Sequence, residues 1–154
     1  MRLKRWNFVT WVVAVCWLVF PTGVVVAQPT DQEDRAAIEK KSKVFMEEFG
    51  AQHHVANYRR LGQRAQEIMS EEAFVAQSSI LRQQVGGEGG GRRAIDFQRS
   101  QRMPGPNGIV YGEFSFVRFA TRYPVGQVYE DIYLEKEADD EWRVVGWWLI
   151  PAPG

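Results

Sequence analysis

The hydrophobic period of this chain changes at a cluster of five glycines between Gly86 and Gly91, and no other feature limits the fold as strongly. Before the cluster, apolar residues recur every three or four positions, as they do along one side of a helix. After it, apolar and polar residues alternate in four runs, as they do in strands. Helices followed by strands predict an α+β fold, in which N-terminal helices pack on a curved four-stranded antiparallel sheet and form a cone-shaped roll.

Three helices are expected before the glycines. The first opens with a capping box at Thr30 and ends at Gly50. The second spans residues 55–68, and four of its apolar residues share one side: Tyr58, Leu61, Ala65 and Ile68. Ser70 caps the third helix, which ends at Gly86 because glycine adopts the left-handed conformation without a steric penalty. The glycines beyond it follow a helix and lack the lysine of a phosphate-binding loop, so we interpret them as a flexible connector.

The four alternating runs predict a meander of antiparallel strands. Their approximate bounds are Arg93 to Met103, Ile109 to Ala120, Gln127 to Glu137, and Glu141 to Ile150. The turn PGPNG at residues 104–108 sets the register of the first two strands. In the second strand, Phe114 and Phe116 are expected to pack inward.

The last run, WRVVGWWLI, is apolar on both faces, which predicts a central or doubly covered strand. Its alternation directs Trp142 and Trp148 into the core. Trp147 has the opposite parity and is expected to face a partner or a second sheet layer, so a homodimer through the sheet face is one possible assembly.

The N-terminus has the pattern of a secretory signal peptide. Three basic residues in the first five positions precede an uncharged run from Trp6 to Ala27. We expect cleavage after Ala27, which leaves residues 28–154 as a single α+β domain in the periplasm or outside the cell. The uncharged run of 22 residues is also long enough to span a membrane. The alternative is therefore an inner-membrane anchor through residues 6–27.

Removal of residues 1–27 would exclude several classes of chemistry. It removes the only cysteine, Cys16, and with it disulfides, thiolate metal sites and cysteine nucleophiles. It leaves 16 basic against 19 acidic residues, a balance that does not indicate nucleic-acid binding. The only histidines, His53 and His54, are neighbours near a helix start and point about 100° apart, so we interpret them as a solvent-exposed pair. We expect no metal, no cofactor and no catalytic residue.

One carboxylate is expected on the apolar face of the sheet. Glu130 shares the parity of Val128, Ile132 and Leu134, and a buried carboxylate is costly unless it is paired. Residues 28–154 hold 12 arginines against four lysines, and the arginines considered as partners are Arg82, Arg118 and Arg143. We interpret the arrangement as a structural ion pair that locks a helix to the sheet. The alternative is a pocket for a small anionic ligand between helices and sheet, lined by Glu130 with these residues: Arg82, Arg118, Arg143, Tyr111 and Trp147.

Several of these residues together resemble a bacterial family of exported domains, domain of unknown function 4019. The resemblance covers roughly residues 58–150. The residues that carry it are Phe74, Arg82, Gly86, Pro104, Gly105, Gly108, Tyr111, Glu130, Trp142, Arg143, Val144, Gly146 and Trp147. The chain departs from the pattern at Phe74, where the family has tryptophan, at residues 83–85, where it has a proline-leucine step, and at Trp147, where it has tyrosine. The family implies no activity, and the expected topology is similar to nuclear-transport-factor-2-like and cystatin-like rolls.

The sequence thus leaves three classes of function open. It favours a noncatalytic module of the cell envelope, either an accessory domain or a protein-interaction module. The alternative is a roll that binds a small anionic ligand. An enzyme is disfavoured, because the chain has no motif with a nucleophile and a base, and only two histidines.

Overall fold

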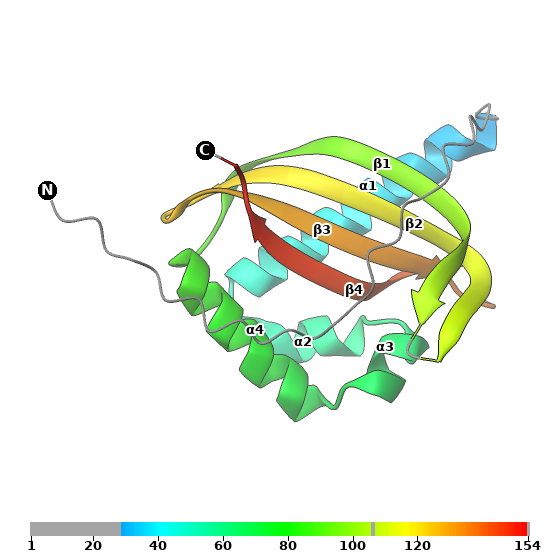
Figure 1. Ribbon diagram of the computed structural model, residues 1–154, viewed down its shortest axis with the longest axis horizontal. Helices are drawn as coiled ribbons and strands as arrows, with labels where there is room; N and C mark the ends of the chain where they lie inside the picture. The colour runs from blue at the N-terminus through cyan, green and yellow to red at the C-terminus, as the bar shows by residue number, and fades with distance from the viewer. Residues whose placement is uncertain (1–28, 106, 154) are drawn as a thin grey trace, which may run out of the picture.

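The computed structural model describes residues 29–105 and 107–153, with side chains from residue 32 onward (Figure 1). The predicted signal peptide or anchor and the side chain of Thr30 lie outside the described residues. The elements in chain order are α1 (Pro29–Gly50), α2 (His54–Arg59), α3 (Gln63–Ile68), α4 (Glu71–Val85), β1 (Gly90–Gly105), β2 (Gly108–Tyr123), β3 (Gly126–Lys136) and β4 (Trp142–Pro151). The predicted α+β order, helices first and strands second, is confirmed.

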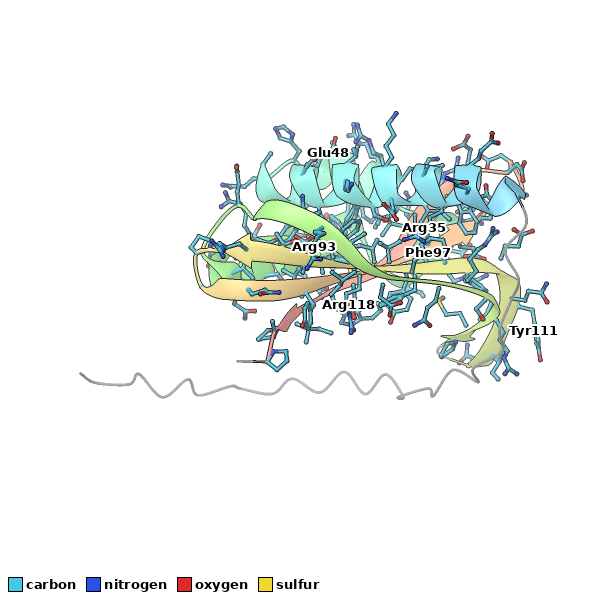
Figure 2. All side chains as sticks on the ribbon, turned by 90° about the horizontal axis from the view of Figure 1, so that it is seen from above. Arg35, Glu48, Arg93, Phe97, Tyr111 and Arg118 are labelled. Atoms are coloured by element: carbon cyan, nitrogen blue, oxygen red, sulfur yellow. The ribbon has the colours of Figure 1, made fainter. Side chains whose placement is uncertain are left out.

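The four strands form one antiparallel sheet in the order β1-β2-β3-β4, so the predicted meander is confirmed. Helix α1 lies across one face of the sheet, and α2, α3 and α4 pack beside it along the β4 side (Figure 1). We call the face that α1 covers the inner face and the opposite one the outer face. Figure 2 shows Arg35 and Phe97 on the side of α1 and Arg118 on the opposite side of the sheet.

The core lies between the helices and the inner face. Its largest fully buried apolar side chains come from both layers: Ile38, Met46, Phe49, Phe74, Val117, Phe119, Ile132 and Leu134. The spacing of the helical members follows the 3.6-residue period, whereas the strand members occupy alternate positions on β2 and β3. The two periods thus distinguish the helical from the strand part of the core.

Helix α4 begins and ends at the predicted residues. The Oγ atom of Ser70 accepts a hydrogen bond from the amide of Ala73 at 3.3 Å, which satisfies one of the free N–H groups of the first turn. Gly86 has a φ of 82°, and its amide and that of Gly87 donate to the carbonyl oxygens of the last turn. The glycine is therefore needed for its backbone conformation.

The single helix predicted over residues 55–68 is wrong, because tertiary pairing divides it into α2 and α3. Between them, Leu61 forms a parallel bridge with Val144, and the amide of Gly62 donates to the Val144 carbonyl at 2.9 Å. A Cβ atom on Gly62 would lie 2.9 Å from a Val145 methyl group, so only glycine lets the chain approach β4 this closely. Ile68, expected on the buried side, is exposed.

The prediction that β4 is central or doubly covered is also wrong, since it is the last strand of the sheet. A β-bulge explains why its parity was misread. Tyr133 pairs with Gly146 and Leu134 with Val144, which leaves Val145 without a partner and reverses the faces of the residues that follow. Trp147 consequently packs in the core, and Trp148 is 44% exposed on the outer face.

Phe114 and Phe116 lie on the outer face rather than inward. Val117 pairs with Ile132 on the inner face, so the pair that precedes it, Phe116 and Tyr133, must point the other way. Phe114 is nevertheless buried, whereas Phe116 is only partly buried. The outer face therefore carries aromatic side chains where a solvated sheet face would carry polar ones.

Candidate functional site

Glu130 points to the inner face as predicted and is fully buried, but its partners are not those expected. Arg92 on β1 reaches across β2 and donates from Nη2 to Oε1 at 2.8 Å and from Nε to Oε2. The hydroxyl of Tyr123 donates to Oε1 at 2.7 Å. The ion pair therefore joins β1 to β3 within the sheet and does not lock a helix to it.

The electrostatics of this buried group keep Arg92 charged and Tyr123 neutral. Burial raises the pKa of Tyr123, and the negative charge of Glu130 raises it further, so the phenol stays neutral and donates. Burial lowers the pKa of Arg92, but the hydrogen bonds and charge of Glu130 outweigh this effect and raise it overall. Three hydrogen bonds occupy the two carboxylate oxygens, and the side chain has no exposed surface, so Glu130 does not face a substrate as a general base would.

The arginines predicted around Glu130 lie in three other places. Arg82 donates from Nε to the carbonyl of Gly50 at 2.6 Å and so ties α4 to the end of α1. Arg118 pairs with Asp131 on the outer face through two hydrogen bonds of 2.6 Å. Arg143 binds the carboxylates of the β3–β4 turn, Glu137 and Asp139.

The two predicted aromatic members do not join Glu130 in one pocket either, although Trp147 points to the same face one row away. Tyr111 is 77% exposed near the tip of the β1–β2 hairpin (Figure 2). The ring of Trp147 packs against Phe74 at 4.8 Å and Phe45 at 5.4 Å between the centroids. The structure thus does not gather the six predicted residues at one place, and their role in ligand binding stays a prediction.

Sequence reasoning missed Arg92 and Tyr123. Tyr123 shares the parity of Val117 and Phe119, so the alternation of β2 could have placed it inward. Arg92 lies within a register irregularity between Gly90 and Arg93, and no local pattern reveals which way a side chain points there.

The two histidines have different environments, so the predicted solvent-exposed pair is only half correct. His53 is exposed, whereas His54 is 5% exposed and its ring lies 5.9 Å from that of Phe49. Its Nδ1 atom has no hydrogen-bond partner among the described residues. Burial lowers the pKa of His54, and the positive charges of Arg82 and His53 lower it further.

A hollow of about 490 Å³ opens between α3 and the β3–β4 turn. Its charged side chains are already paired: Arg64 binds both oxygens of Glu135 at 2.9 Å, and Arg143 binds Glu137 and Asp139. The hollow therefore has the features of a solvated ion-pair network.

Within the described part of the chain, no group of histidines and carboxylates could hold a metal ion. None of the helices in these residues combines the length and the apolar character that a membrane span requires.

The outer face is the remaining candidate, and its centre consists of planar side chains in contact. The middle row from β1 to β4 contains Asp96, Arg118, Asp131 and Trp148, and the next row contains Gln98, Phe116, Tyr133 and Gly146. The ring of Tyr133 lies 5.0 Å from that of Phe116 and 4.8 Å from that of Trp148. An aromatic strip thus crosses three neighbouring strands.

Arg118 completes this strip and holds it in place. Its guanidinium group lies 5.6 Å from the centre of the Phe116 ring and 5.4 Å from that of Tyr129. Its partner Asp131 is 4% exposed, although it points to the face opposite α1. Because the arginine is fixed by a carboxylate and two rings, the surface is ordered before any partner arrives.

Comparison with known proteins gives one match. The model of the family described as "Protein of unknown function (DUF4019)" matches residues 41–147, more than half of the chain. No curated protein matches the chain, and neither does any solved structure. The expected likeness to nuclear-transport-factor-2-like rolls therefore stays a prediction.

Proposed function

Since the chain belongs to the DUF4019 family, whose function is unknown, we propose a function from its own geometry: an exported, noncatalytic module that binds a protein partner through the outer face of its sheet. The observation that carries the proposal is the strip of Phe116, Tyr133 and Trp148, part of which is exposed on a face whose centre is covered by none of the helices α1 to α4.

The composition of the outer face supports protein binding. Interfaces are enriched in tryptophan, tyrosine, phenylalanine and arginine, and their central residues are large and rigid. Four strands spaced by about 4.8 Å and about ten residues of about 3.3 Å each give a face of roughly 600 Å². A standard interface buries about 800 Å² per partner, so this face alone suits a transient complex of modest size.

The proposal that the module is exported rests on the N-terminal segment, with its basic start and uncharged run from Trp6 to Ala27. The proposal that it is noncatalytic rests on the buried site, where Arg92 and Tyr123 already occupy both oxygens of Glu130. The alternative, a small anionic ligand bound between helices and sheet, would require one of these contacts to open.

Site-specific photocrosslinking tests the proposal. A photoreactive phenylalanine analogue replaces Trp148 on the outer face or, as the control, Ile80, which is exposed on α4. In the native cell, position 148 should give a discrete adduct with another protein, and position 80 should not. Equal labelling at both positions, or none at position 148, would refute an interaction through the outer face, and an adduct of twice the chain mass would identify the partner as a second copy.

A further inference from the structure

The two ends of the outer face differ in chemistry, and the difference indicates what kind of partner fits the proposed function. Arg93 lies opposite Ala120, and Arg122 follows Ala120 by two residues on the same face of β2. Both arginines are exposed, and neither has an ion-pair partner among the described residues. This end therefore holds two cations that are free to bind anions.

These two arginines differ from the charged side chains that β2 and β3 place further along the outer face, which are paired. Arg118 is neutralised by Asp131, and Glu135 is neutralised by Arg64 from α3. Residues 28–154 as a whole carry more acidic than basic side chains, 19 against 16. The arginine end is thus a local positive site on an otherwise acidic domain, and it attracts carboxylates.

The opposite end of the same face offers an apolar hollow of about 20 Å³. Its apolar lining comes from Met103, Phe114, Phe116 and Tyr133, so it accepts a small apolar group next to the aromatic strip, and its rim also carries polar residues: Gln98, Arg99, Ser100, Arg102 and Ser115. A volume of this size holds about one group as large as a water molecule or a methyl. Small pockets of this kind beside aromatic residues are where single anchoring side chains bind at interfaces.

The spacing of these two features sets the length of what binds. Phe114 and Arg122 are eight residues apart on β2, which corresponds to about 26 Å at roughly 3.3 Å per residue. An extended peptide of about eight residues spans the same distance. We infer that the outer face binds an extended acidic segment of a partner protein, with an apolar side chain in the hollow and carboxylates on Arg93 and Arg122.

A second copy of the chain fits these features less well than an acidic segment does. In a face-to-face dimer with parallel strands, the two arginine ends would meet and repel each other. In the antiparallel arrangement, each arginine end would meet the opposite end of the outer face, which carries Glu135. Both carboxylate oxygens of Glu135 are already bound by Arg64. Neither arrangement supplies free carboxylates to Arg93 and Arg122.

Synthetic eight-residue peptides test the inference. Each has alanine at one end, whose methyl group matches the hollow, alternating threonine and serine in the middle, and two glutamates, two glutamines or two lysines at the other end, and each is made in both directions. Binding to the purified protein is followed in two-dimensional proton–nitrogen correlation NMR spectra, with peptide added up to millimolar concentration. The indole N–H signal of Trp148 reports contact with the outer face. The double variant Arg93→Glu/Arg122→Glu is compared with Arg59→Glu, which alters an exposed arginine on α2.

The glutamate peptide should shift the Trp148 signal, and its affinity should fall about tenfold or more in the double variant and remain unchanged in Arg59→Glu. It should also fall with added salt, since exposed charges are screened. Equal binding of the glutamate and lysine peptides, or no loss in the double variant, would overturn the inference. If crosslinking succeeds at position 148 but no acidic peptide binds, this inference fails and the proposed function stands. Sedimentation could also show that the protein is a dimer that the peptide dissociates. The outer face would then bind a second copy of the chain, and the inference would be overturned.

Discussion

The buried pair of Arg92 and Glu130 makes a sharp prediction about stability. Replacing Arg92 with methionine keeps the apolar stem of the side chain but leaves a carboxylate with no exposed surface and no cation beside it. Removing one partner of a buried ion pair costs about 3–5 kcal/mol. A domain of this size has a free energy of unfolding of about 5–15 kcal/mol, so Arg92→Met should remove about a fifth of the stability or more.

Urea denaturation followed by tryptophan fluorescence measures this loss. With a slope of about 1–3 kcal/mol per molar urea, the midpoint should fall by roughly 2 M. The double variant Arg92→Met/Glu130→Gln removes both charges and should be more stable than Arg92→Met alone, because no unpaired charge remains buried.

A matched control separates this effect from the loss of any arginine. Arg60 pairs with Glu48 at the surface, and exposed pairs contribute about 0–1 kcal/mol, so Arg60→Met should barely move the midpoint. The reasoning would be refuted by equal shifts in Arg92→Met and Arg60→Met, or by a double variant no more stable than Arg92→Met.

Three further predictions follow from other sites. The pKa of His54 is lowered in the fold, so as the pH falls the unfolded chain takes up a proton before the folded protein does, and the stability that is fully present above pH 6.5 decreases below it. Urea midpoints measured between pH 7.5 and 5.5 should show this decrease in the unaltered protein and in His53→Gln. The decrease should be smaller in His54→Gln. A Cβ atom on Gly89 would lie 2.6 Å from a methyl carbon on β2, so Gly89→Ala should cost about 1–3 kcal/mol in thermal unfolding, whereas Gly90→Ala, with open space around its Cβ, should cost less. Intact mass measurement of the protein recovered from the cell envelope should show an N-terminus after Ala27, and an unprocessed mass would indicate the anchor instead.

The local sequence determined the elements whose signals lie within a few residues of each other. Ser70 and Gly86 bound α4 because a cap and a left-handed glycine act on the backbone next to them. The four alternating runs predicted the meander, since short connections between strands lead to antiparallel neighbours. The inward position of Glu130 followed from the same alternation, because β3 runs without irregularity beside β2.

Only the tertiary structure decided the features that depend on contacts between distant segments. The bulge at Val145 reverses the parity of β4, so that Trp147 enters the core and Trp148 reaches the outer face. The pairing of Leu61 with β4 divides a continuous helical pattern. Arg92 reaches Glu130 across β2 because of the register between strands, which no local alternation encodes. A periodic pattern indicates which side chains share a face. An extra residue in a strand or a hydrogen bond to a remote segment then decides which face that is. The buried pair and the aromatic strip both depend on such long-range decisions.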